Sequence, residues 1–476
     1  MKRSPLLAVL VLTGCAVTTP ETPTAQIAPP VPTYLQAPAG PLPGAWWEAR
    51  LGDPALRRLV DAALAASPDL EAAAARIDQA RAQVRLAGAN RLPAINGSAG
   101  VTASRTAPTQ TGFDPGRLGI PGVSADNERV IGQIGIDASF DADLFGRLRA
   151  DRAAARLRLT AASADAAQVR LALVTDVSRA LVAARAADAR ARVVAQSVAT
   201  ARDLVSITGA RTRAGLVAGI DEVRARGLLA ETAAALPQLE GERERQVAVL
   251  STLTALPPAE VGGLVAADGP GRFGAPAAGL PSELLQRRPD IQAALLRVRA
   301  FDSDTAAALA DRFPRLTITA GLGLVAGALG DLFNGDGLFA SVGPGLAGPL
   351  LDFGRNRARV EAARARTAEA VAGYRGTVLG AFGEVEQALA LIRARERQRL
   401  LLASQGREQA DVARIARIQY RAGLTDFLSV LDAEQAAFRV REAEARVAGE
   451  LADAELALFR AVGGDLGEQS ALVAGN

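Results

Sequence analysis

Four segments of the chain alternate apolar with small or polar residues at period two, the pattern of strands with one apolar face. They lie at about 94–105, 130–141, 315–325 and 338–348. Alternation of this kind over about ten residues is typical of outer-membrane barrel strands. An ordinary sandwich with one buried face is the competing interpretation. Gly-rich stretches at 107–129 and 326–337 join the strands within each pair, and in a barrel they would be extracellular loops.

A different period, apolar residues three and four apart, follows each strand pair and predicts long helices. Val174, Val177 and Leu181 show this spacing in a proline-free stretch that begins at Gly146. About 65 helical residues would extend near 100 Å. Each long helix is expected to fold back on a return helix, which gives antiparallel coiled-coil hairpins over about 146–256 and 354–462. The first return helix is expected from about Ile220 to Leu256. A coiled-coil rod without a pore is the alternative.

The two strand-and-hairpin sets are an internal duplication. Ser67-Pro68-Asp69-Leu70 returns 221 positions later as Arg288-Pro289-Asp290-Ile291, and Phe145-Gly146-Arg147 returns 208 positions later as Phe353-Gly354-Arg355. We therefore expect a first repeat at 46–260, a linker at 261–285, a second repeat at 286–462 and a tail at 463–476.

Four strands cannot close a membrane barrel, because single-chain barrels have about eight or more. Open sheet edges are excluded from the hydrocarbon region. Other copies of the chain must therefore complete the barrel, with eight strands from two copies or twelve from three.

The N-terminus has the pattern of an export signal. Basic Lys2 and Arg3 precede a short apolar run, which ends in Leu12-Thr13-Gly14-Cys15. This tetrapeptide resembles the bacterial lipobox, which implies removal of residues 1–14 and a covalent lipid on Cys15. An incidental cysteine within a discarded signal is the alternative. In proteins with a lipobox, an Asp after the cysteine commonly signals retention in the inner membrane. Because Ala16 stands there, the resemblance implies an anchor in the outer membrane. Residues 15–45, rich in Pro and Thr, are expected to form a tether.

Composition argues against catalysis. The 476 residues include no histidine and one cysteine, so a Ser-His-Asp triad and a His- or Cys-ligated metal site are not available. No enzyme activity and no cofactor apart from the lipid are expected. Arginines alternate with acids along the helices, which favours solvated ion-pair faces over a nucleic-acid site. No run of 18 or more uncharged apolar residues follows the N-terminus.

The joints between strand and helix and the tips of the hairpins carry a family resemblance. The motifs are Asp143-Leu144-Phe145-Gly146-Arg147, Leu351-Asp352-Phe353-Gly354-Arg355, Arg213-Ala214-Gly215-Leu216 and Arg421-Ala422-Gly423-Leu424, with Trp46-Trp47 and Asp53-Pro54. With the lipobox they resemble the outer-membrane factor family (TolC/OprM-like), in its NodT-type lipoprotein branch of RND multidrug efflux systems. Ser67 departs from the family, which often has Asn there.

The resemblance implies a homotrimer, with a 12-stranded barrel in the outer membrane and an α-barrel of coiled coils crossing the periplasm. A belt would surround the α-barrel, and this belt or the end of the α-barrel would include Trp46-Trp47, the segment 257–285 and the C-terminal tail after Gly463. Drugs or other small molecules would pass passively through the lumen of the channel, after an inner-membrane RND pump hands them over through a periplasmic adaptor. The alternatives are the outer-membrane factor of a type I secretion system, a periplasmic adaptor and a structural coiled-coil lipoprotein.

The resemblance also assigns roles to single residues. At the periplasmic gate it implies an acidic ring from Asp432, an apolar plug from Leu428, Ser429 in place of a second acid, and a latch between Tyr420 and Asp221. For adaptor docking it implies the tip residues Gly215, Leu216, Gly423 and Leu424. Simpler interpretations are a packed Tyr420, a surface Asp432, an N-cap at Asp221 and glycines that only end helices.

Overall fold

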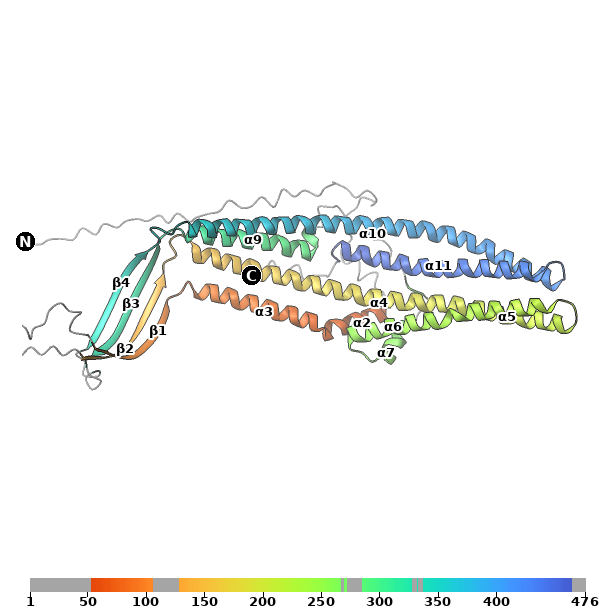
Figure 1. The fold of residues 1–476 in the computed structure, drawn as a ribbon, viewed down its shortest axis with the longest axis horizontal. Coiled ribbons are helices and arrows are strands. Elements are labelled where there is room, and N and C mark those ends of the chain that lie inside the picture. The colour runs from red at the N-terminus through yellow and green to blue at the C-terminus, as the bar shows by residue number, and fades with distance from the viewer. Residues whose placement is uncertain are drawn as a thin grey trace, which may run out of the picture. The chain divides into compact units, whose positions relative to one another are not determined.

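The computed structural model describes residues 53–105, 128–266, 269–271, 285–327, 332 and 337–464 (Figure 1). Cys15, the tether, Trp46-Trp47, most of both strand-joining loops and the tail from 465 lie outside the described residues. The described chain forms two compact units. One contains 78–159 and 296–371, and the other contains 53–77, 160–295 and 372–464.

The first unit is built on a four-stranded antiparallel sheet. Its strands are β1 (Ala94–Arg105), β2 (Glu128–Asp141), β3 (Arg315–Ala326) and β4 (Leu338–Ala347). Their order is β1-β2-β3-β4, so β2 of the first repeat pairs with β3 of the second. Ile134 pairs with Leu324 in that register, and Leu322 pairs with Ala340 in the next ladder. Because paired residues share a face, the apolar faces of all four strands lie on one side of the sheet.

This apolar face is exposed in the single chain. Ile95 is 71% exposed, Leu322 54% and Val342 79%. On the opposite face the Phe339 ring lies over Gly323, where an added Cβ would come within 2.7 Å of the ring and 2.6 Å of the Ile134 carbonyl oxygen. Only glycine therefore fits at that position.

Four helices, labelled in Figure 1, have residues in both units. They are α3 (Pro68–Ala89), α4 (Arg147–Arg213), α9 (Pro289–Ala310) and α10 (Arg355–Arg421). α4 and α10 have 67 residues each. The prediction of long helices with four antiparallel strands, arranged as a duplication, is confirmed.

The return helices of the two repeats differ. In the second repeat α11 (Phe427–Ala461) is unbroken, whereas the first repeat has α5 (Gly219–Ala234) and α6 (Leu236–Thr254). The helix expected from about Ile220 to Leu256 is interrupted at Ala235, whose backbone stays in the right-handed helical region (φ −76°, ψ −21°). Pro237 lies at the start of α6 and has no N–H to donate to the preceding turn.

The joints between strand and helix use a carboxylate to begin the long helices. Asp143 accepts hydrogen bonds from the main-chain N of Leu148 at 2.8 Å and of Arg149 at 3.0 Å. At the second joint Asp352 accepts from Asn356 N at 2.9 Å and Gly354 N at 3.0 Å. These two backbone hydrogen bonds lower the pKa of Asp352. Both helix starts therefore have partners for their free N–H groups.

In the second unit, α2 (Pro54–Ala66) and α7 (Pro258–Val265) pack against α4 and α6. The buried side chains are those of Leu56, Leu59, Val60 and Ala63 from α2, Val174, Val177, Ala180, Leu181 and Ala184 from α4, Val247 and Leu250 from α6, and Val261 and Val265 from α7. Asp53 caps α2 by accepting a hydrogen bond from Ala55 N at 2.9 Å, and it also accepts a hydrogen bond from Arg185 Nη1. Arg185 donates onward to the carbonyl of Val265 at 3.2 Å, which fastens this layer to α4.

Arg288 ties together the corresponding part of the second repeat. Its guanidinium pairs with Asp290 at 2.7 Å and Glu384 at 2.6 Å, and it donates to the Ala461 carbonyl at 2.9 Å. It is 6% exposed. One side chain therefore joins the start of α9, the middle of α10 and the end of α11.

No single described helix is long and apolar enough to cross a membrane. One bent pair, Gly219–Thr254 with Pro258–Val265, meets that test by length and composition alone.

Candidate functional site at the hairpin tips

Both long helices end in the same turn. Gly215 and Gly423 adopt φ of +71° and +75°. Gly215 N donates to Thr212 O and Leu216 N to Arg211 O, at 3.0 and 2.9 Å. The second tip repeats this with Gly423 N to Tyr420 O and Leu424 N to Gln419 O, at 3.0 and 2.8 Å. This is the Schellman motif, in which glycine takes the left-handed position.

The residue after each glycine points an apolar side chain outward. In a Schellman motif this position frequently contacts the preceding turn. Leu216 is instead 68% exposed and Leu424 78% exposed. Both side chains are therefore accessible to a partner, and their role in docking stays a prediction.

The helices that leave the tips begin differently. Asp426 caps α11 by accepting from Ser429 N at 2.9 Å and Ser429 Oγ at 2.7 Å, and these bonds lower its pKa. The N-cap of α5 is Ala218, which has no capping side chain. The interpretation of Asp221 as an N-cap is therefore wrong, because Asp221 lies in the first turn and its N–H donates to Ala218 O at 3.1 Å.

Beneath the tips, the four helices of the two hairpins share one apolar core. The buried residues are Ala201 and Leu204 of α4, Ala225 and Leu228 of α5, Ala413, Ala416 and Tyr420 of α10, and Phe427, Val430, Ala433 and Ala437 of α11. Tyr420 is 3% exposed, and its ring centre lies 5.5 Å from that of Phe427. The two tips are therefore packed together and do not stand apart.

Among the residues that the structure describes, none forms a hydrogen bond with the buried Tyr420 hydroxyl. Burial and, next, the Asp221 charge raise the pKa of Tyr420, while Arg211 acts against them. Asp221 itself lies 3.9 Å from the guanidinium of Arg224. The structure thus places Tyr420 and Asp221 near one another but does not form the expected hydrogen bond between them.

Leu428, Ser429 and Asp432 lie on the exposed side of α11. Positions 428 and 432 are one helical turn apart, and Phe427 and Val430 point into the core instead. The three residues expected at the constriction are therefore accessible on one helix in the single chain.

Two arginines near the tips were not singled out from the sequence. Arg211 donates to the Tyr420 carbonyl. Arg417 pairs with Glu434 at 2.9 Å, where burial raises the pKa of the Glu434 carboxyl against the opposing charge of Arg417. An arginine in the last turn of a helix is an ordinary C-terminal pattern. The sequence therefore did not indicate that Arg211 contacts the other hairpin.

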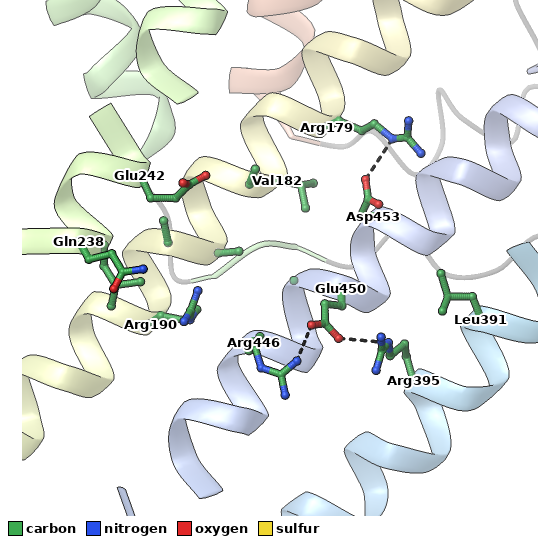
Figure 2. Close-up of a pocket in the computed structure, with 15 residues that line it drawn as sticks. Arg179, Val182, Arg190, Gln238, Glu242, Leu391, Arg395, Arg446, Glu450 and Asp453 are labelled. Carbon is green, nitrogen blue, oxygen red and sulfur yellow. Dashed lines mark hydrogen bonds and ion pairs between the residues drawn. The ribbon is translucent and has the colours of Figure 1, made fainter. Parts of the chain in front are cut away.

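Further along the second unit, a cavity of about 500 Å³ lies among α4, α6, α10 and α11 (Figure 2). Its charges are paired across helices: Arg179 with Asp453 at 3.0 Å, and Arg395 with Glu450 at 3.1 Å. Among the described residues, no group of three His, Cys, Asp or Glu side chains could hold a metal ion. The paired charges brace the helices.

Comparison with known proteins decides the family. The family described as "Outer membrane efflux protein" matches residues 59–256 and 280–464, one segment for each repeat. The chain belongs to the outer membrane efflux protein family. The expected resemblance is therefore confirmed.

Curated relatives of this family match nearly the whole chain. The pyoverdine export outer membrane protein OpmQ of Pseudomonas putida is 32% identical over 460 residues, covering 96% of each chain. The outer membrane protein OprJ of Pseudomonas aeruginosa is 31% identical over 466 residues, covering 93% of this chain and 94% of its own. A solved structure of the outer-membrane channel OprN superposes with a TM-score of 0.84 at 29% identity, covering 94% of this chain and 99% of the other.

These relatives establish the general function. The protein is an outer-membrane channel of the efflux type and not an enzyme, as the sequence predicted. The hairpin tips and the exposed apolar sheet described above are thus parts of an efflux channel.

Proposed function

We propose that three copies of the chain form a passive conduit that exports drugs or other small molecules from an RND-type pump and its periplasmic adaptor to the outside. The observation that carries the proposal is the sheet, with one continuous apolar face exposed and β1 and β4 as its outer strands. A face of this kind fits lipid, and an open edge in lipid must be paired. Three copies would bring twelve strands, whose lumen is wider than the nearly filled interior of eight.

In this proposal residues 1–14 are removed, Cys15 carries the lipid and the 15–45 segment tethers the body to the outer membrane. The lipobox-like Leu12-Thr13-Gly14-Cys15 supports this assignment. Several acyl chains give stable anchoring where one is marginal. The mass of the N-terminal peptide of the mature protein tests it, since an unmodified peptide that still contains residues 1–14 would contradict it.

The periplasmic gate lies at the hairpin tips. Asp432, with Leu428 and Ser429 on the same exposed side of α11, would line the constriction in the trimer, and Leu216 and Leu424 with their turn glycines would receive the adaptor. Three like-charged carboxylates at a narrow axis would favour cations. In the closed trimer, Asp221 would accept a hydrogen bond from Tyr420, since it is the carboxylate whose charge acts on that hydroxyl.

Planar-bilayer conductance of the purified protein tests the channel and the gate together. We expect a low-conductance, cation-selective pore whose cation preference weakens in Asp432→Asn. Asp411→Asn is the matched control, because Asp411 is an exposed acid on α10. We also expect Tyr420→Phe to raise conductance. An unchanged preference in Asp432→Asn would place Asp432 outside the lumen, and absence of conductance in every variant would contradict the channel proposal.

A further inference from the structure

One side chain of the first hairpin closes on the tip of the second. Arg211, in the last turn of α4, donates from Nη1 to the main-chain carbonyl of Tyr420. Its guanidinium carbon also lies 4.7 Å from the centre of the Tyr420 ring. The two residues belong to different repeats but to the same compact unit. The contact therefore joins the two hairpins directly at their tips.

The carbonyl that Arg211 reaches lies at the C-terminal end of α10. The last carbonyls of a helix lack helical N–H partners and carry the negative end of the helix dipole. The Tyr420 carbonyl accepts one bond within the tip, from Gly423 N at 3.0 Å. The Arg211 guanidinium adds a positively charged donor there. It thus caps α10 from another helix.

The contact of Arg211 with the Tyr420 ring also connects Arg211 to the start of α11. The Tyr420 ring is buried and packs against Phe427, the first residue of α11, which is 1% exposed. A guanidinium over a shielded ring gains a cation–π attraction. Arg211 is therefore linked to both the end of α10 and the start of α11.

The contact is made in one direction only. At the 208-residue spacing of the repeats, Arg211 corresponds to Gln419 and Tyr420 corresponds to Thr212. Gln419 is neutral and exposed, so the second tip offers no charged donor to the first at this place. Beside the shared apolar core, the charged contact with the end of α10 is therefore made by one arginine of the first hairpin.

We propose that Arg211 is a clasp that keeps the second hairpin tip against the first, so that its release lets the end of α10 and the start of α11 move. The clasp uses the main-chain carbonyl and the ring face of Tyr420 and is independent of the tyrosine hydroxyl. It rests on the proposed function, because only in a gated conduit does movement of this tip change the flow of ions.

Two readouts on the full-length trimer separate the clasp from the channel. The first is hydrogen–deuterium exchange of peptides that cover 418–428, and the second is bilayer conductance. Arg211→Met removes the charged, planar guanidinium but keeps an unbranched apolar side chain. We expect its tip amides to exchange about two- to thirty-fold faster, the range typical of a charge at a helix end, and its conductance to rise. Arg213→Met is the matched control, because Arg213 is exposed in the same last turn, and both readouts should stay at wild-type values.

Each outcome supports or overturns the role of Arg211 as a clasp. Wild-type exchange in Arg211→Met would overturn the clasp, and equal acceleration in Arg213→Met would reduce it to a general charge effect. If Arg211→Met does not assemble, Arg211→Lys is measured instead. It keeps the charge without the planar fork, so intermediate exchange supports the clasp and wild-type exchange overturns it. Faster exchange without conductance in any variant would leave the clasp in place and contradict the proposed function.

Discussion

Asp53 shows how one carboxylate can hold several elements at once. It caps α2 and receives the guanidinium of Arg185, which also bonds to the end of α7. Burial alone would raise the pKa of Asp53, but the hydrogen bond and charge of Arg185 and the backbone bonds outweigh it and lower the pKa. A lowered pKa means that the folded state favours the ionised carboxylate. Asp53 therefore links the stability of this layer to pH.

The sign of this dependence gives the first prediction. The contribution of Asp53 is present above its unfolded pKa, near 3.8, and is lost as pH falls through its lower folded pKa. Asp53→Asn keeps an N-cap side chain but removes the charge. We expect the variant to have a lower melting temperature than the wild type at pH 7. The difference in melting temperature should become smaller toward pH 3, as measured by circular dichroism in detergent.

The exposed Asp61 on the same helix supplies the control. Asp61→Asn should leave the melting temperature near the wild-type value at both pH values. A gap for Asp53→Asn that stays constant with pH would show that the ion pair with Arg185 does not carry the effect.

At the scale of elements, α4 and α11 come together through small residues. A Cβ added at Gly449 would lie 2.6 Å from the Cβ of Ala186. Ion pairs lie on both sides of this contact, Arg179–Asp453 at 3.0 Å and Arg190–Glu442 at 2.5 Å. The glycine sets the helix spacing, and the ion pairs fix the register of the two helices.

Two glycine substitutions should therefore change the free energy of unfolding in opposite directions. Gly449→Ala forces the helices apart, and overpacking of this kind typically costs about 1–3 kcal/mol. Gly227→Ala in α5 meets nothing within 4 Å and should stabilise the helix by about 0.5–1 kcal/mol. Thermal unfolding followed at 222 nm compares them. Stabilisation by both would mean that α4 and α11 can separate without loss.

The elements were predictable from the sequence because their signals are local. Period-two alternation placed the strands, and the repeat placed the tips at Gly215 and Gly423. The break at Ala235 was missed although Pro237 marks it, because the apolar spacing continues across it. The positive φ of Asp143 and Phe353, +48° and +52°, left no sequence signal, since neither residue is glycine.

The contacts within the site were harder to predict. Arg211 and Tyr420 are 209 positions apart, and their meeting depends on how two hairpins align along their length. A one-turn shift between the hairpins would replace Arg211 with another side chain. Resemblance therefore supplied the candidate residues Tyr420 and Asp221, while the structure showed which groups are in contact.

At the scale of the whole molecule, the outer strands β1 and β4 predict how copies join. Paired β1 and β4 of adjacent copies would continue the antiparallel order of the sheet. Side chains alternate between faces along a strand. Only residues on the same face of the two strands can then be linked across such a junction.

Cysteine cross-linking tests this junction. Cys15 is kept, because its sulfur carries the lipid in the proposed function. Ser98→Cys is combined with cysteine at Phe339, Ser341 or Gly343, which share its face by the strand register. We expect oxidation to give covalent dimers and trimers for at least one pair. Proteins in which Ser98→Cys is combined with cysteine at Ala340 or Val342, on the opposite face, should stay monomeric after oxidation. Linking by both sets, or by neither, would contradict the β1–β4 junction.

The β2–β3 ladder has a consequence for how the molecule came to be. Each repeat supplies one strand pair, and the junction between repeats is an ordinary antiparallel ladder like those within them. In the proposed trimer, six strand pairs and six helical hairpins would follow one another around the axis. A half-length ancestor could have built the same ring from six separate copies. Fusion of two such genes would have let alternate hairpins diverge, which would account for Arg211 at one tip and Gln419 at the corresponding position of the other.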